Sequence, residues 1–277
     1  MSSTTDRKIL KIAILSFIII FPVYLLLLRS HLNLPTDISV GPLNVRTYAI
    51  FILLGISLSA YLFNIYKDKE KSLKNVDVLD ALLWIIIPAI IGGRIWHLIT
   101  DFSIYKDNLI EMLYIWNGGM GIFGGIIGGF FGAYIYSKKN KADLRKGLSL
   151  LAVFLPIGQV IGRFGNFANK ELYGFETNVP WGMVLSENGK IYHPTFMYEQ
   201  IGMFVLFLLM FWQFSKRGIS EIFIPLYLGG YGVVRFSVDF FRTEPEILFG
   251  FTVAQHTSIV MILIAVLYFA KLRQLSK

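Results

Sequence analysis

The chain has 277 residues, of which 55% are hydrophobic and only 16% are charged. A soluble protein of this length can bury a core with less apolar sequence, and it normally carries more charge. The net charge of +8 could suggest a nucleic-acid partner, but most of the excess lies in short segments between apolar blocks, which indicates membrane topology instead. The absence of cysteine excludes disulfides, thiolate metal sites and a cysteine nucleophile of its own, and we expect no cofactor.

The apolar residues form separate blocks of about 20, the length at which a helix crosses a bilayer. These blocks lack the alternation of transmembrane strands, and a segment in lipid must satisfy its own backbone hydrogen bonds, so the blocks predict helices. We therefore expect an all-α, polytopic transmembrane helix bundle of about eight spans, with a small outer-face segment between spans five and six. The expected spans are 9–28, 46–66, 78–99, 118–136, 148–168, 197–214, 221–241 and 252–270.

Positively charged residues gather at the start of the chain, in alternate loops and at its end. Lys and Arg are enriched in cytoplasmic loops, so the pattern predicts a multi-pass protein of the bacterial cytoplasmic (inner) membrane with both termini cytoplasmic. The residues concerned are Arg7, Lys8 and Lys11; Lys67, Lys69, Lys71 and Lys74; Lys138, Lys139, Lys141, Arg145 and Lys146; Lys216 and Arg217; and Lys271, Arg273 and Lys277.

The first apolar block follows a basic start, so it could be either a retained helix or a cleaved signal peptide. Its exit, residues 28–32, lacks the small-residue pattern that a signal peptidase requires, which favours a retained helix.

Polar side chains recur near the predicted outer ends of several spans. Ionisable groups inside a membrane are costly, so each is a functional candidate, with a structural ion pair or a snorkelling side chain as the alternative. Those of the seventh span fall at i, i+4, i+8 and i+11, which places them on one helix stripe. The candidates are Arg46, Tyr48, Arg94, His97, Arg163, Asn166, Glu171, His193, Glu199, Tyr231, Arg235, Asp239 and Arg242.

Arginines outnumber the nearby carboxylates among these candidates, and the planar guanidinium suits bidentate binding of a phosphate. The set Arg94, Arg163, Arg235 and Arg242 therefore predicts a pocket for an anionic phospholipid, with a water-soluble anion as the alternative. Asp239, one turn after Arg235, could equally hold that arginine in one rotamer.

Glycines form two ridges in the fourth span, Gly121, Gly125 and Gly129 on one and Gly124, Gly128 and Gly132 on the other. Small residues at this spacing let neighbouring helices approach closely. The preceding segment 118–121 is too rich in glycine for a regular helix start, and it could form a loop that presents free backbone N–H groups near the arginines.

The segment from Ile161 to Gly174, IGRFGNFANKELYG, resembles the signature G-R-x-G-N-F-x-N-x-E-x-x-G of the prolipoprotein diacylglyceryl transferase family. Other family motifs are matched in order over about residues 41–270. These are Gly41-Pro42 with Arg46-Thr47-Tyr48, Gly92-Gly93-Arg94, Trp116 to Met120, His193-Pro194 with Tyr198-Glu199, Tyr231 to Arg235, and Phe240-Phe241-Arg242.

The resemblance implies an enzyme that moves diacylglycerol from phosphatidylglycerol to the lipobox cysteine of a prolipoprotein signal peptide, releasing glycerol phosphate. The reaction would take place at the outer face of the cytoplasmic membrane, with no nucleic-acid partner. By the same resemblance Arg163 and Arg235 are catalytic, and the substrate-binding residues are Arg163, Asn166, Glu171, Tyr48, Arg94, Tyr231, Asp239, Arg242 and His193.

The chain departs from the family pattern at Phe123, where members carry a histidine with a role in the chemistry, and at Asp239, where glutamate is usual. Phenylalanine cannot accept a thiol proton, although His97 could substitute. The first span is also additional, so we expect an extra helix and outer loop over 1–40 and a transferase-like domain over 41–277. Alternatives are a relative with another acceptor or lipid, a non-catalytic binder of anionic phospholipid, or a transporter.

Overall fold

A computed structural model describes residues 4–30, 34–41, 43–106, 108–185 and 189–275. Pro42 and Lys277, which belong to the patterns above, lie outside the described residues. Eight α-helices account for most of the described chain, so the predicted all-α class is confirmed. The chain divides into two compact units, one formed by residues 1–63 with 148–277 and the other by residues 64–147. Each unit is described by itself.

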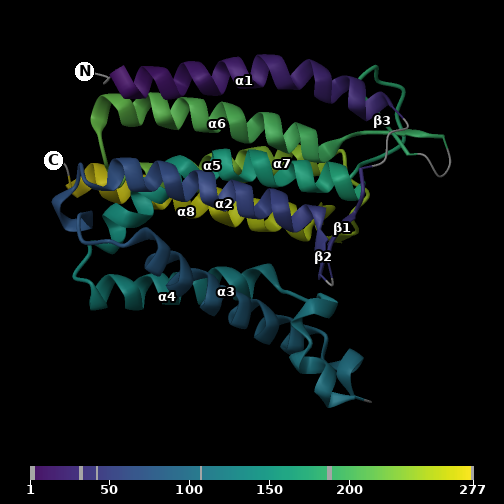
Figure 1. Cartoon of the computed structure of the whole chain (residues 1–277), viewed down its shortest axis with the longest axis horizontal. Coiled ribbons are helices and arrows are strands. Elements are labelled where there is room, and N and C mark those ends of the chain that lie inside the picture. The colour runs from purple at the N-terminus through teal and green to yellow at the C-terminus, as the bar shows by residue number, and fades with distance from the viewer. Residues whose placement is uncertain (1–3, 31–33, 42, 107, 186–188, 276–277) are drawn as a thin grey trace. The chain divides into compact units, whose positions relative to one another are not determined.

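The first unit consists mainly of six helices. Two of them extend by one turn into the sequence range of the second unit. The helices are α1 (Thr4–Arg29), α2 (Thr47–Lys67), α5 (Leu144–Asn169), α6 (Thr195–Arg217), α7 (Phe223–Asp239) and α8 (Val253–Leu275). The start of α1, the turn between α6 and α7 and the end of α8 lie at one end of this unit (Figure 1). These are among the basic regions of the sequence, as the predicted topology requires.

Three short antiparallel hairpins close the opposite end of the first unit (Figure 1). They pair β1 (Asp37–Val40) with β2 (Leu43–Arg46), β3 (Met183–Val184) with β4 (Ile191–Tyr192), and β5 (Glu246–Leu248) with β6 (Phe251–Thr252). The second hairpin belongs to the outer-face segment expected between spans five and six, so that segment is small and partly ordered as strands.

Helix α1 packs on α6 and on the hairpin end of the first unit through aromatic contacts. The rings of Phe17 and Phe204 are stacked with centroids 4.3 Å apart, and Tyr24 meets Phe167 edge-on at 5.2 Å. Tyr24 is buried in a cluster with Phe167 and Phe196, so the first apolar block is an integral layer of this unit.

The second unit is a helical hairpin with a long, irregular connection. It contains η1 (Lys71–Leu73), α3 (Val78–Thr100), η2 (Phe102–Tyr105), η3 (Leu109–Leu113), η4 (Ile115–Asn117) and α4 (Ile122–Lys139). Asp77 begins α3 by accepting hydrogen bonds from the backbone N–H groups of Leu79 at 2.9 Å and Asp80 at 3.1 Å. This N-cap satisfies donors that a helix start otherwise leaves unpaired.

The predicted glycine ridges differ in how tightly they hold α4 against α3. A Cβ on Gly124 would lie 2.1 Å from the Gly92 carbonyl oxygen, and one on Gly132 would lie 1.8 Å from that of Trp84. A Cβ on Gly125 would have its nearest neighbour at 3.6 Å, an ordinary contact. The ridge Gly124–Gly128–Gly132 therefore makes a seam of backbone against backbone, as small residues in membrane helices allow.

Six of the helices, α1, α2, α3, α5, α6 and α8, are long and apolar enough to cross a membrane. The chain is therefore a multi-pass membrane protein. The other two, α4 with 18 residues and α7 with 17, coincide with expected spans, and their crossing stays a prediction. Helix α7 ends at Asp239, so the single helix stripe expected to include Arg242 is wrong in its last member.

Candidate functional site

A buried carboxylate joins two arginines at the hairpin end of the first unit. Glu199, in the second turn of α6, is 1% exposed and forms an ion pair with Arg163 of α5. Its other oxygen lies 3.5 Å from a terminal nitrogen of Arg242. A carboxylate this deeply buried costs free energy unless charged partners and hydrogen bonds surround it. Two guanidinium groups supply both.

The signature segment on α5 forms a chain of hydrogen bonds. Arg163 Nη1 donates to Asn166 Oδ1 at 3.1 Å, and Asn166 Nδ2 donates to Glu171 Oε1 at 2.7 Å. Asn166 is buried, so both ends of its amide are held in place. The spacing of Arg163, Asn166 and Glu171 in the sequence thus corresponds to one connected network in space.

The second ion pair, Arg235 with Asp239, lies on α7 and is supported by the end of β6 and the start of α8. Arg235 Nη1 lies 2.6 Å from Asp239 Oδ1, one turn later on α7, so Asp239 holds this arginine as the sequence suggested. The other oxygen of Asp239 accepts a hydrogen bond from the hydroxyl of Thr252. Gln255 of α8 in turn accepts from the Thr252 backbone N–H at 3.0 Å. Thr252, at the end of β6, therefore holds the carboxylate that holds the arginine.

Arg242 lies just beyond the end of α7 and turns toward α6. Its Nε donates to the hydroxyl of Thr195 at 3.3 Å, and the Thr195 hydroxyl donates to the Leu172 carbonyl. The side chain is buried and faces Glu199, so it joins the Arg163 network from another element. Its position past the helix end is what allows this turn.

Two tyrosines border the arginine network. Tyr48, at the start of α2, interacts electrostatically with Arg163 and Glu171, and its ring lies against Gly165, where a Cβ would approach it to 2.6 Å. Tyr231 on α7 interacts electrostatically with Glu199 and with Arg163, Arg235 and Arg242. Both predicted substrate-binding tyrosines therefore lie beside Arg163.

His193 belongs to an aromatic cluster next to this network, between β4 and α6. Its Nδ1 is 2.8 Å from the hydroxyl of Tyr198, which also accepts from the indole N–H of Trp181 at 2.9 Å. The ring of Phe241 lies 5.2 Å from that of His193. Burial lowers the pKa of His193, so the ring is neutral at pH 7.

Arg94, which the sequence grouped with these arginines, belongs to the second unit and is bound by its own loop. It donates four hydrogen bonds to backbone carbonyls of Met112 at 2.9 Å, Glu111 at 2.7 Å, Gly118 at 2.7 Å and Gly119 at 3.1 Å. That Arg94 binds substrate stays a prediction. These contacts favour a structural role in folding the connection between α3 and α4.

The glycine-rich segment before α4 is a loop, as predicted, but it presents different groups to the arginine. Gly118 and Gly119 have φ values of 87° and 75°, which favour glycine, and helix α4 begins only at Ile122. Their carbonyl oxygens, rather than the free N–H groups expected, face Arg94. The segment thus supplies acceptors to a cation, and that it also presents free N–H groups stays a prediction.

The family-histidine position and its possible substitute also lie in the second unit. Phe123 packs its ring 5.6 Å from that of Trp96. His97 pairs through Nδ1 with Asp101 Oδ2 at 3.0 Å and meets Tyr105 edge-on at 5.9 Å. These contacts orient the imidazole of His97, and they favour the structural role for it.

Charge at the site is more balanced than the sequence suggested. Within the first unit, Arg163, Arg235 and Arg242 are matched by Glu171, Glu199 and Asp239. The arginines are nonetheless the more accessible partners, with side chains of Arg163 and Arg235 21% and 15% exposed, against 1% and 0% for Glu199 and Asp239. In each of these two ion pairs the carboxylate is enclosed and the arginine side chain retains some exposure.

Sequence reasoning noticed Glu199 but did not place it in the site, and it missed Thr195, Thr252 and Gln255. A carboxylate in an apolar span was the available signal for Glu199, because such groups are costly without partners. The uncharged residues gave no comparable signal. Among the described residues no group of three His, Cys, Asp or Glu side chains could hold a metal ion.

Comparison with known proteins shows the family to which the chain belongs. A family model described as prolipoprotein diacylglyceryl transferase matches residues 35–271. The chain belongs to the prolipoprotein diacylglyceryl transferase family. The resemblance predicted from the sequence motifs is therefore confirmed, and with it membership in a family of transferases.

Relatives named phosphatidylglycerol–prolipoprotein diacylglyceryl transferase match this family member over most of its length. The protein of Finegoldia magna is 35% identical over 83% of this chain and 92% of its own. That of Ehrlichia canis is 35% identical over 84% and 93%, and that of Streptococcus pneumoniae is 34% identical over 82% and 90%. The predicted boundary between residues 1–40 and 41–277 stays a prediction.

Proposed function

We propose that this protein transfers the diacylglyceryl group of phosphatidylglycerol to the lipobox cysteine thiol of prolipoprotein signal peptides. The observation that carries the proposal is the pair Arg163 and Arg235, each held by a buried carboxylate and each more exposed than its partner. Family membership and the names of the relatives supply the donor lipid and the acceptor. The reaction would take place at the outer face of the bacterial cytoplasmic membrane.

In this mechanism the thiolate sulfur of the acceptor attacks the glyceryl carbon that carries the phosphate ester. A carbon–sulfur bond forms, the carbon–oxygen bond breaks, and glycerol phosphate leaves with the electron pair. Arg163 and Arg235 bind the phosphate and stabilise the charge that grows on it, because guanidinium donors aimed at a developing anion lower the barrier. Asp239 and Glu199 hold those donors in place before the lipid arrives.

Apart from Arg94, the remaining predicted substrate-binding residues lie in the first unit with these two arginines. Tyr48 and Tyr231 border the arginines, Asn166 and Glu171 orient Arg163, and Arg242 shares Glu199 with it. His193 is neutral and hydrogen-bonded to Tyr198. We therefore assign it to the part of the site that contacts the prolipoprotein peptide, and not to phosphate binding.

Thiol deprotonation has no dedicated imidazole at position 123 in this mechanism. A free thiol has a pKa of about 8.5 and is partly ionised at neutral pH, and neighbouring positive charge lowers that pKa. A more acidic thiolate is also a weaker nucleophile, so this route is slower than one with a placed base. We therefore expect a working but slow enzyme.

A non-catalytic protein that binds anionic phospholipid is the second candidate, and Phe123 is the observation that favours it. Such a protein would keep the arginine network but would lack the histidine that can accept the proton of the acceptor thiol. A family enzyme with another acceptor or lipid is a third reading on the same grounds.

The deciding experiment incubates the purified protein with phosphatidylglycerol and a lipobox peptide and measures the peptide mass. Transfer adds the mass of one diacylglyceryl group and releases glycerol phosphate in equal amount. Lipid binding that depends on Arg163, with no peptide modified at any pH, would establish the second candidate. A peptide with serine in place of the lipobox cysteine is the control.

We also propose that both termini are cytoplasmic and that residues 1–40 add one helix and an outer loop to the transferase domain 41–277. The chain has no cysteine, so single cysteines can report sidedness without background. Lys190→Cys in the outer segment should react with a membrane-impermeant thiol reagent in intact cells. Lys141→Cys should react only after permeabilisation, and the opposite result would invert the topology.

A further inference from the structure

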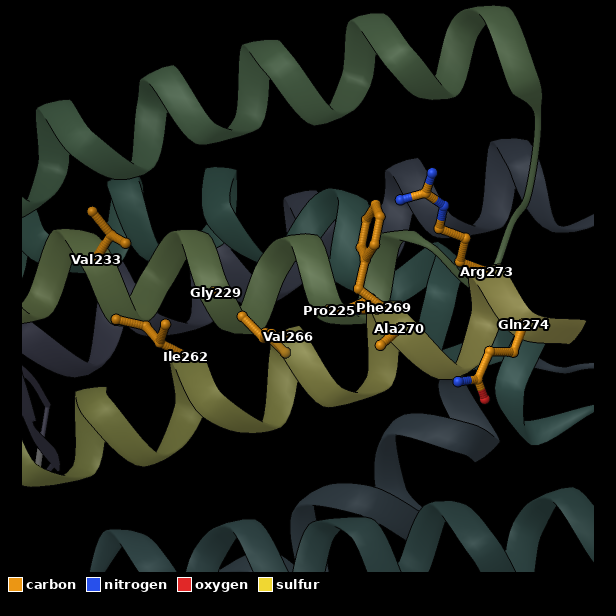
Figure 2. A pocket seen from close by; sticks show the side chains of 10 residues that line it. Pro225, Gly229, Val233, Ile262, Val266, Phe269, Ala270, Arg273 and Gln274 are labelled. Atoms are coloured by element: carbon orange, nitrogen blue, oxygen red, sulfur yellow. The ribbon is translucent and has the colours of Figure 1, made fainter. Parts of the chain in front are cut away.

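An apolar groove runs along α7 and α8, away from the arginine network. It encloses about 770 Å³ and is lined by Pro225, Gly229 and Val233 of α7 and by Ile262, Ala265, Val266, Phe269, Ala270, Arg273 and Gln274 of α8. Figure 2 shows Val233 and Ile262 toward one end and Arg273 and Gln274 toward the other. Its volume falls within the roughly 300–1,000 Å³ of small-molecule sites.

The groove exists because small residues alternate with large ones on two facing helices. Pro225, Gly229 and Val233 recur every four residues on α7, which places them in one row. A Cβ on Gly229 would lie 3.3 Å from the Ala265 side chain, so α7 and α8 are in close contact at the bottom of the groove. Val266 and Phe269 are exposed and form the rim, so the groove opens to the surroundings of the helix pair.

Its dimensions match one bilayer leaflet. From Ile262 to Arg273 the groove follows α8 for 11 residues, or about 16 Å at 1.5 Å per residue. Half of a hydrocarbon core of about 30 Å is about 15 Å. Helix α8 is itself long and apolar enough to span the membrane, and the groove occupies its C-terminal half.

The two ends of the groove differ in polarity. Val233 and Ile262 make one end wholly apolar, whereas Arg273 and Gln274 place a guanidinium and an amide at the other. The basic turn between α6 and α7, with Lys216 and Arg217, lies at this same end of the first unit (Figure 1). Basic groups at the end of an apolar channel complement an anionic headgroup above an acyl chain.

We propose that this groove binds one anionic phospholipid, with an acyl chain along Gly229 and Ala265 and its phosphate at Arg273. The site is separate from the arginine network, which lies at the hairpin end of the same unit. With cytoplasmic termini, the lipid belongs to the cytoplasmic leaflet, whereas the donor lipid of the proposed reaction belongs to the outer one. The occupant is a lipid of the membrane and not free phosphate, because free phosphate leaves the apolar length unfilled.

The test titrates the detergent-purified full chain with phosphatidylglycerol or phosphatidylcholine and counts bound lipids by native mass spectrometry. Ala270→Trp fills the groove and should remove one bound lipid, whereas Leu267→Trp, on the same helix but outside the lining, should not. Arg273→Gln should keep the lipid but lower its preference for phosphatidylglycerol about fivefold, the factor equivalent to about 1 kcal/mol for one basic residue at headgroup depth. Lys271→Gln is the charge-matched control.

Helical content by circular dichroism and the gel-filtration profile establish that each variant is folded. If Ala270→Trp fails these checks, Val266→Phe fills the same groove from its exposed rim. An unchanged lipid count in the folded groove variant would overturn the site, as would loss of the lipid in the Leu267 control. An unchanged headgroup preference in Arg273→Gln would overturn the assignment of the phosphate. Binding of inorganic phosphate in competition with the lipid, at equal affinity, would also contradict it.

Discussion

Arg94 and Arg163 both lie toward the end of an apolar helix, each with a family motif around it, yet their surroundings differ: Arg94 is buried, whereas the Arg163 side chain is 21% exposed. Arg94 donates four hydrogen bonds to backbone carbonyls of the loop between α3 and α4. Arg163 is held by side chains, the carboxylate of Glu199 and the amide of Asn166. An arginine wrapped by carbonyls has few donors left for a ligand, whereas one held by a carboxylate from behind can still present its other edge.

The difference assigns separate tasks to the two units. In the first unit arginines are positioned by acids on neighbouring helices, which is an arrangement for binding an anion. In the second unit an arginine and a glycine seam hold two helices and their connection together. Changes in the first should therefore alter activity more than stability, and changes in the second should do the reverse.

The largest expected effect is the loss of transfer on replacing the two site arginines. Arg163→Lys and Arg235→Lys should each lower the transfer rate by about 10²–10³-fold, because lysine keeps the charge but not the planar pair of donors. Folding should be retained, as measured by thermal unfolding in detergent. Near-normal turnover in both variants would identify these arginines as structural ion-pair partners.

Phe123→His tests the division of tasks between the two units. It lies in the second unit, where changes should affect stability more than activity, and yet we expect it to change activity. An imidazole there should raise the rate near neutral pH by about 10²-fold if it serves as a general base. The unmodified protein should speed up toward alkaline pH as the acceptor thiol ionises, so the gain should shrink there. A pH–rate profile of both proteins on one lipobox peptide measures this.

One other result of that profile would redirect the mechanism. A native enzyme that is already fast at neutral pH, with no gain from Phe123→His, means that another residue is the base. His97→Gln is then the variant to compare, although its pairing with Asp101 makes a structural role the expected one.

Arg94→Lys should affect stability more than chemistry. A lysine can reach only some of the four carbonyls, and each buried acceptor left without a donor costs about 1–3 kcal/mol. We expect a lower free energy of unfolding with transfer reduced only in proportion to the folded fraction. A specific loss of lipid binding at full stability would place Arg94 in the ligand site after all.

The glycine seam allows a matched pair of variants on one helix. Gly124→Ala puts a methyl group where only 2.1 Å separate it from the Gly92 carbonyl oxygen, and overpacking of this kind costs about 1–3 kcal/mol. Gly125→Ala, with 3.6 Å to its nearest neighbour, should be nearly neutral. Equal thermal stability of the two variants would show that α3 and α4 separate easily.

The smallest expected effect concerns pH. Because burial lowers the pKa of His193 in the folded protein, the unfolded chain binds more protons once the pH falls below the ordinary histidine pKa of 6.5. Stability should therefore be full above that value and decline as the pH falls below it. His193→Gln should flatten the decline between pH 7 and 5 in unfolding measurements. An unchanged slope would show that His193 is as solvated folded as unfolded.

Much of the fold was predictable because hydrophobic length is a local property. The helices begin and end within several residues of the expected spans, and Arg163, Asn166 and Glu171 were found because their motif is contiguous in sequence. What failed depends on tertiary contacts. The balance of charge around Glu199, the turn of Arg242 beyond α7 and the carbonyls that surround Arg94 arise only when distant segments meet.

The support of Arg235 by Thr252 has a consequence for biosynthesis. The seam between α3 and α4 joins neighbours in the chain, so it can form while later helices are still being made. Asp239, by contrast, gains its second partner only when Thr252 of β6 has been made. A nascent chain that stops before β6 would contain every arginine of the site without the contact that aligns Arg235. The arginines of the site would then be synthesised before the hydroxyl that completes their alignment.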